Sequence, residues 1–116
     1  MAFQNCLRGS ILTIDLDAIA DNYRILRETA NPTKVAAVVK ANAYGLGADK
    51  IAPLLQNSGC NIFFVATLDE AVQLRSILPH AEIHVFNGIL PGWPKVMIEH
   101  RLRPVLNSLE QVNLWH

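Results

Sequence analysis

The residues with the clearest chemical potential are Lys40 and Tyr44, which lie four positions apart. An unbroken run of small or β-branched apolar residues, 35–39, leads into the lysine, and two glycines follow the tyrosine within three residues. An apolar run without alternation is typical of a strand buried on both faces of a parallel sheet. Lys40 is therefore expected at the carboxyl end of a strand, which is where α/β barrels build their sites.

Two interpretations of Lys40 follow from its position. A lysine that closes an apolar strand can be a solubilising gatekeeper against aggregation. It can also be a nucleophilic amine at the mouth of a low-dielectric pocket, where desolvation favours the neutral form. Gly45 and Gly47 would let the backbone approach a ligand closely. Position alone does not decide between the two interpretations.

The segment 37–48, AVVKANAYGLGA, resembles the pyridoxal-phosphate signature of alanine racemases. The resemblance continues upstream through residues 14–18, IDLDA, with Asn22, and downstream through residues 66–71, ATLDEA. It covers nearly the whole chain from Ile11 onward. Leu46 departs from the pattern, because many members of the family carry histidine there.

The resemblance implies that Lys40 is catalytic and forms a covalent imine with pyridoxal 5'-phosphate, and that Tyr44 contacts the cofactor phosphate. The implied reaction is the racemisation of L- and D-alanine, which supplies D-alanine for peptidoglycan, in a cytoplasmic homodimer. In the family, the second acid–base group is a tyrosine of a C-terminal β domain. No residue here matches it, so we expect the isolated chain to be inactive.

Two alternatives remain at this point. The chain could belong to another pyridoxal-phosphate barrel enzyme, such as an amino-acid decarboxylase or an aldolase, although the context of Lys40 argues against this. It could also be a catalytically silent, truncated module that merely associates with other proteins.

The hydrophobic pattern predicts an α/β fold with a parallel sheet of the (β/α) TIM-barrel type. A closed barrel typically needs ~250 residues, whereas this chain has 116. We therefore expect about half a barrel, with roughly four core strands and an exposed edge. The expected strands cover residues 35–39, 61–66, 82–86 and 103–106, and the expected helices cover 16–30, 48–56, 67–78 and 95–100, with a last one starting near 108.

We interpret residues 1–116 as the N-terminal fragment of a cofactor-binding barrel domain. Residues 1–15 would carry a strand that packs on a missing C-terminal β domain, so we expect this strand to be loose or paired elsewhere. The chain stops about two turns into its last expected helix, which we interpret as an unfinished boundary. Residues 1–10 do not resemble a signal peptide, and no apolar run approaches the ~20 residues of a membrane span.

Local signals fix several helix ends. Asp15 is a candidate N-cap, and Asn31-Pro32 should end the first helix. The spacings of Thr67 with Glu70, and of Ser108 with Gln111, predict capping boxes. In the first helix the expected inner stripe is Leu16, Ile19, Tyr23, Leu26 and Ala30. Phe86, at the end of the third strand, is expected to pack in the core.

Composition narrows the possible partners. The formal net charge is zero and no basic stripe is visible, which argues against nucleic-acid and anionic-membrane partners. Cys6 and Cys60 have no metal or redox spacing, and Cys60 is expected to be a buried free thiol, as suits a reducing cytoplasm. The four histidines form no metal-binding motif, so no metal site is predicted. Glu82 and His84 share a strand face, which is typical of a surface pair.

Overall fold

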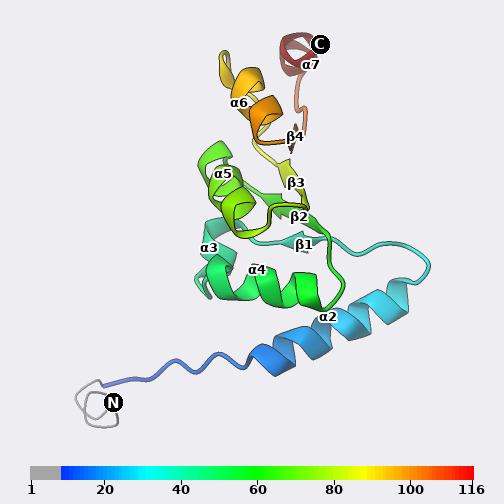
Figure 1. The fold of residues 1–116 in the computed structure, drawn as a ribbon, viewed down its shortest axis with the longest axis vertical. Helices are drawn as coiled ribbons and strands as arrows, with labels where there is room; N and C mark the ends of the chain where they lie inside the picture. Colours follow the sequence, from blue (N-terminus) through cyan, green and yellow to red (C-terminus); the bar gives the residue numbers. More distant parts are fainter. Residues whose placement is uncertain (1–8) are drawn as a thin grey trace.

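The computed structural model describes residues 9–116 and forms one parallel sheet with strand order β1-β2-β3-β4 (Figure 1). The strands are β1 (Ala37–Val38), β2 (Ile62–Val65), β3 (Glu82–Val85) and β4 (Leu102–Pro104). The helices are α2 (Leu16–Ala30), α3 (Lys40–Tyr44), α4 (Ala48–Asn57), α5 (Leu68–Ile77), α6 (Trp93–Glu99) and α7 (Leu109–Trp115). The expected open, four-stranded half-barrel is confirmed.

The register of the sheet sorts its side chains into two faces. Phe63 lies opposite Ala37 on one side and Ile83 on the other, and Ile83 lies opposite Leu102. All four are buried, and alternate residues along β2 and β3 share that burial. Side chains alternate across a strand, so one face of the sheet forms the core together with the helices. The buried core includes Ile51, Ala52 and Leu55 of α4, Ala71 and Leu74 of α5, and Met97 of α6.

The second face of the sheet is only partly covered. Phe64 stacks on His84 and on Phe86, with ring centroids 4.4 and 4.9 Å apart. All three rings are half-buried rather than buried. The expectation that Phe86 packs in the core is therefore wrong: its ring extends an aromatic row on the open face, because it follows the same alternation as Phe64 and His84.

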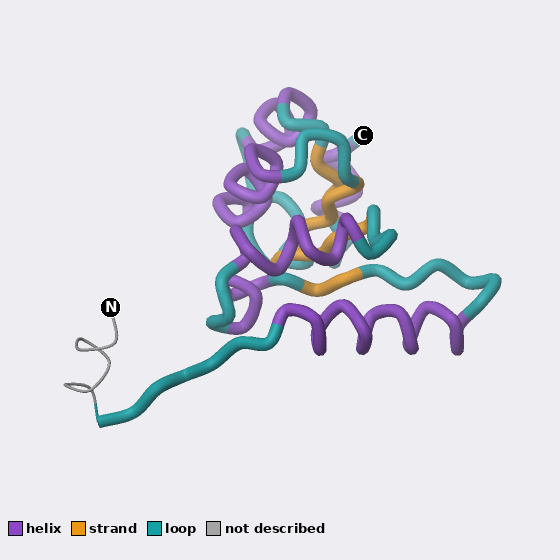
Figure 2. The backbone as a smooth tube through the Cα atoms, turned by 60° about the horizontal axis from the view of Figure 1, so that its bottom comes forward, coloured by secondary structure: helices purple, strands orange, loops and turns teal. Residues whose placement is uncertain are grey.

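Helix α2 begins and ends where its caps predict, since Asp15 accepts the Ala18 N–H and the last helical residue is Ala30. Its predicted inner stripe is only partly correct. Tyr23 is buried, but Leu16 and Leu26 are 37% and 59% exposed. The reason is that α2 contacts mainly α4 and runs along the edge of the domain (Figures 1 and 2).

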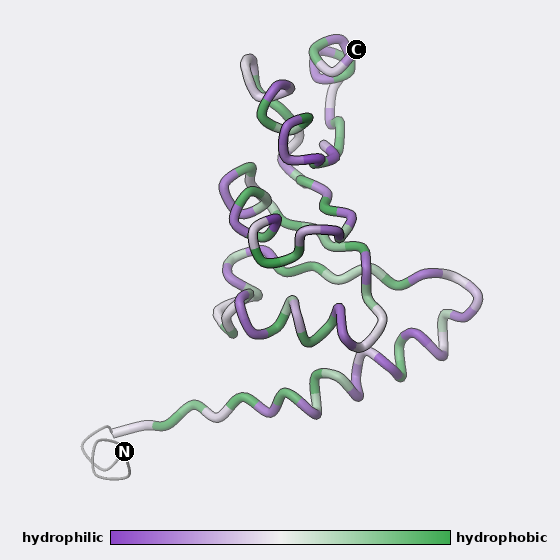
Figure 3. The backbone as a smooth tube through the Cα atoms, in the orientation of Figure 1, coloured by the Kyte–Doolittle hydropathy of each residue, from purple (hydrophilic) through white to green (hydrophobic). Residues whose placement is uncertain are grey.

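Residues 9–15 form no strand in the structure. They extend away from the domain with Ile11 and Leu12 exposed, so apolar residues lie along an unpaired segment (Figure 3). The strand expected in this region is not formed, because none of the strands in residues 9–116 lies beside it to supply hydrogen bonds. The predictions for residues 1–8, including that for Cys6, lie outside the part of the chain that the structure describes.

Of the two predicted capping boxes, one is complete. Thr67 and Glu70 exchange both bonds at the start of α5. At α7, Ser108 accepts the Gln111 N–H, but the Gln111 side chain accepts from Asn107 N rather than from the cap residue. The Gln111 side chain thus bonds the residue before the N-cap and not the N-cap residue, so this capping box is incomplete. Cys60 is a buried free thiol, as predicted.

Helix α5 also carries a buried charge that the apolar pattern did not predict. The Arg75 guanidinium donates only to main-chain carbonyl oxygens. Burial, and to a smaller extent the charge of Arg101, lowers the pKa of Arg75. The accepting carbonyls are those of Leu78, Pro79, Ala81, His100 and Arg101, at 2.7–3.2 Å.

Within residues 9–116, none of the helices combines the length and apolar character that a membrane span needs.

Candidate active site

Lys40 is the first residue of α3, and only Val39 separates it from the short strand β1. The strand is shorter than predicted because Val39 already leaves the extended conformation, with ψ near 26°. The four residues after Lys40, from Ala41 to Tyr44, have φ between 50° and 55°. This short element is therefore a left-handed turn rather than an ordinary α-helix or loop.

A left-handed turn made of non-glycine residues needs compensation. L-residues lose roughly 1–2 kcal/mol each in this conformation, and they normally adopt it singly. Strained backbone of this kind persists only where the surroundings over-determine it, and it concentrates at functional sites. Asn42 tolerates the conformation well and Gly45, at φ 86°, adopts it freely. Nothing in the sequence marks Ala41 and Ala43 for it, so sequence analysis missed the turn.

Backbone hydrogen bonds hold much of the turn. Ala43 N donates to Val39 O at 3.0 Å, Gly45 N to Ala41 O at 2.9 Å and Gly47 N to Asn42 O at 2.9 Å. The Asn42 side chain accepts the Ala48 N–H at 2.9 Å. It thereby caps α4, whose own N-cap residue, Gly47, has no side chain to do so. The turn and the following helix are thus fixed to each other.

Glu70 ties the turn to the neighbouring strand. Its Oε2 accepts the Ala41 N–H at 2.5 Å. Its Oε1 accepts the backbone N–H groups of Ala66 and Thr67 at 3.2 and 3.0 Å, and the Thr67 hydroxyl at 3.2 Å. The capping box predicted the bonds at Thr67 but not the bond to Ala41, which joins residues 29 positions apart.

The structure brings the two predicted site residues into one five-residue segment at the carboxyl end of the sheet. Lys40 is half-buried and forms none of the salt bridges found among the described residues. Tyr44 is 62% exposed, so most of the residue is accessible from solvent. The pair therefore offers one primary amine and one phenolic donor at the strand ends.

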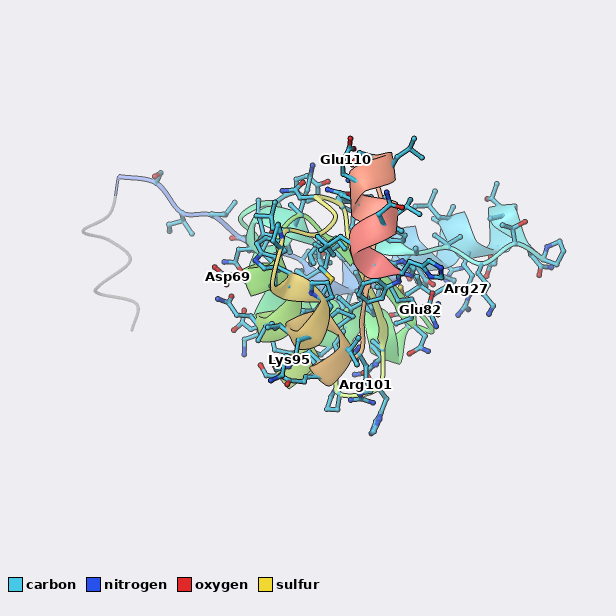
Figure 4. The ribbon with its side chains drawn as sticks, turned by 90° about the horizontal axis from the view of Figure 1, so that it is seen from above. Arg27, Asp69, Glu82, Lys95, Arg101 and Glu110 are labelled. Carbon is cyan, nitrogen blue, oxygen red and sulfur yellow. The ribbon has the colours of Figure 1, made fainter. Side chains whose placement is uncertain are left out.

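Two cavities flank the sheet. One, of about 490 Å³, lies between α3, α4 and α5 and is lined in part by Ala41 and Glu70. Neither Lys40 nor Tyr44 lines it, so it lies behind the turn on the helix-covered side. The other, of about 310 Å³, is lined in part by Arg27 and Glu82, which lie on the same side of the molecule (Figure 4).

Glu82 is the centre of a charged cluster at the other end of the strands. Its Oε1 accepts from His84 Nε2 at 2.7 Å and from Arg103 Nη1 at 2.9 Å. The hydrogen bond from His84 is the main cause that lowers the pKa of Glu82, and the charge of Arg103 acts in the same direction. Among residues 9–116, no group of three His, Cys, Asp or Glu side chains could hold a metal ion.

Comparison with known proteins places this geometry in a family. Residues 14–116 match the family described as "Alanine racemase, N-terminal domain". An alanine racemase of Brucella ovis is 51% identical over 108 residues, which cover 92% of this chain and 27% of that protein. The chain thus spans less than a third of that relative's length.

Solved structures give the same result. An alanine racemase from Bartonella henselae, described with covalently bound pyridoxal phosphate, superposes with a TM-score of 0.84 at 46% identity, covering 88% of this chain and 29% of that one. A histidine racemase from Leuconostoc mesenteroides reaches 0.79 at 26% identity, covering 86% and 27%. The match along almost the whole described chain shows that the protein belongs to the alanine racemase N-terminal domain family.

Proposed function

We propose that this chain provides the attachment point for pyridoxal 5'-phosphate in an enzyme that interconverts L- and D-alanine. Lys40 is the residue that carries the cofactor, and Tyr44 is the donor to its phosphate. The observation that supports this most is the placement of Lys40: a half-buried amine, outside the salt bridges of the described chain, at the carboxyl end of β1 in the family's fold.

The residues present fit such a group. The primary amine of Lys40 can condense with an aldehyde, and the exposed Tyr44 hydroxyl can donate to an anionic oxygen. When bound, pyridoxal phosphate supplies the electron sink that stabilises negative charge at the substrate α-carbon. The free Lys40 amine would then be the group that takes or returns the α-proton on one face of that carbon.

The proposal extends to the organisation of the protein. Residues 1–116 are the N-terminal part of the cofactor-binding barrel, alanine is the substrate, and the functional unit is a homodimer. We assign no residue of this chain to the opposite face of the α-carbon. Racemisation by these 116 residues alone should therefore stay near the background of free cofactor. A cytoplasmic location stays a prediction.

Reductive trapping tests the role of Lys40. The chain is incubated with pyridoxal phosphate, reduced with borohydride and mapped by mass spectrometry. We expect the adduct to concentrate on Lys40 and to disappear in Lys40→Ala. Lys50→Ala, which removes an exposed lysine of α4, is the matched control and should leave the Lys40 adduct unchanged. Labelling spread evenly over the surface lysines would contradict the proposal.

A second candidate substrate is suggested by the similarity to a histidine racemase. A substrate amine that displaces Lys40 should reduce the adduct trapped there. We expect L-alanine to lower the Lys40 adduct at smaller concentrations than L-histidine does, after correction for the imine that each amino acid forms with free cofactor in solution. The reverse order would move the proposed substrate to histidine and keep the role of Lys40.

A further inference from the structure

Glu70 makes more bonds than helix capping requires. Its Oε1 alone serves the start of α5, through Ala66 and Thr67. Its Oε2 is directed to a different element and accepts the N–H of Ala41. One carboxylate therefore joins the carboxyl end of β2 to the peptide that follows Lys40.

This bond acts on a strained part of the backbone. Ala41 has φ 50°, a left-handed conformation that is unfavourable for alanine. The Ala41 N–H lies in the peptide plane that joins Lys40 to Ala41, so the bond to Glu70 fixes this plane at the residue where the left-handed backbone begins. Charge-assisted hydrogen bonds are about twice as strong as neutral ones, and the N-terminus of α5 favours a negative charge at this place. Glu70 therefore holds the peptide from which the left-handed turn starts.

We propose that Glu70 is a positioning residue for Lys40. By holding the Ala41 N–H against the end of β2, it sets the place and direction from which the Lys40 side chain leaves the sheet. The inference rests on the proposed role of Lys40 and deepens it. Glu70 touches neither cofactor nor substrate in this scheme; it acts through the backbone.

Two substitutions separate positioning from capping. In Glu70→Gln, only one oxygen remains, so the amide can accept at Thr67 or at Ala41 but not at both. Thr67→Ala removes the hydroxyl that accepts the Glu70 N–H and donates to Glu70 Oε1, but it leaves both carboxylate oxygens and their backbone donors at Ala41, Ala66 and Thr67 in place. Thr67→Ala is therefore the matched control for a weakened start of α5.

Two readouts are compared in the 116-residue chain. The first is hydrogen exchange at the Ala41 amide, which reports local opening. We expect it to quicken about tenfold or more in Glu70→Gln and to stay near the wild-type rate in Thr67→Ala. The second is the share of borohydride-trapped cofactor found on Lys40, which should fall several-fold in Glu70→Gln and stay unchanged in Thr67→Ala.

A third measurement needs no variant. In the wild-type chain, the chemical shifts of the Ala41 amide proton and of the Glu70 carboxyl carbon are followed while the pH is lowered. Both should change over the same pH range, because protonation removes the charge that accepts the Ala41 N–H. An Ala41 shift or exchange rate that ignores Glu70, or an equal response to Thr67→Ala, would overturn the proposal. Trapping that does not prefer Lys40 in the wild type would refute the proposed function instead, while the Ala41 measurements still decide whether Glu70 holds the turn.

Discussion

The two ends of helix α5 bind the backbone with opposite charges. At its start, the Glu70 carboxylate accepts from N–H groups beside Lys40, at the carboxyl ends of the strands, called here the carboxyl edge. Near its end, the Arg75 guanidinium donates to carbonyl groups that precede β3 and β4, at the amino ends of the strands, called here the amino edge. Each sign matches the helix dipole at that end. Helix α5, which packs on β3 (Figure 1), thus bonds to backbone at both the carboxyl and the amino ends of the strands.

The two ends differ in what they hold. Arg75 is buried, and its five acceptors belong to segments that have no chemical task in the proposed function. Glu70 is half-buried and holds a strained turn next to the proposed reactive amine. In barrels of this class, chemistry is built at the carboxyl edge and stability at the amino edge. The comparison suggests that α5 serves both, with Arg75 contributing most to stability and Glu70 most to placement.

The largest effect is expected at Arg75. Arg75→Ala would remove five hydrogen bonds, two of them buried, and only Pro79 O would keep another side-chain donor, so the free energy of unfolding should fall by at least about 3 kcal/mol. Small domains have about 5–15 kcal/mol in total, so the variant should be close to unfolding. Urea denaturation followed by circular dichroism measures the loss.

Arg101→Ala is the matched control for Arg75. The Arg101 guanidinium donates to Pro79 O at 2.7 Å, one of the carbonyls that Arg75 also contacts, but from the exposed side. Its loss should cost less than about 1 kcal/mol. Equal losses for Arg75→Ala and Arg101→Ala would show that the amino edge does not depend on the buried cation.

The second effect concerns the strain beside Lys40 and has an unusual sign. Ala41→Gly should stabilise the chain by about 0.5–1 kcal/mol, because glycine relieves the left-handed strain by more than it adds unfolded-state entropy. The exposed Ala18 of α2 is a control with right-handed backbone, and Ala18→Gly should destabilise by about 0.5–1 kcal/mol. Thermal unfolding of both variants gives the two signs. A loss for Ala41→Gly as large as that for Ala18→Gly would mean that the turn is not strained.

Much of the fold could be predicted because its signals are local. Asp15, Thr67 and the apolar runs fix helix starts and strands without knowledge of the rest of the chain. The predicted inner stripe of α2 was less reliable, since Leu26 is exposed. Periodicity identifies an apolar face but not whether a neighbour is present to cover it.

The site was predictable in its residue types and not in its conformation. Lys40 and Tyr44 could be singled out from the signature around them, and their roles stay predictions. The left-handed turn between them depends on a carboxylate from a later helix. Arg75 was missed for a related reason: its acceptors include carbonyls 25 and 26 positions away. Contacts between charged side chains and distant backbone groups leave no periodic trace in a sequence.

The smallest effect sharpens the comparison through pH. Glu82, at the amino edge, has a lowered pKa because it accepts from His84 and pairs with Arg103. A carboxyl whose folded pKa lies below its unfolded value stabilises the fold above the unfolded value, and this stability is lost as pH falls through the folded pKa. Acid should therefore weaken the amino edge as the pH drops below the ordinary glutamate range near ~4.3.

Glu82→Gln should flatten the acid side of the plot of unfolding free energy against pH. Glu99→Gln, which replaces an exposed carboxyl of α6, should leave that plot unchanged. Urea midpoints between neutral pH and about pH 3 provide the profile. Parallel acid profiles for wild type and Glu82→Gln would show that the amino edge depends on the buried Arg75 and not on this partly exposed cluster.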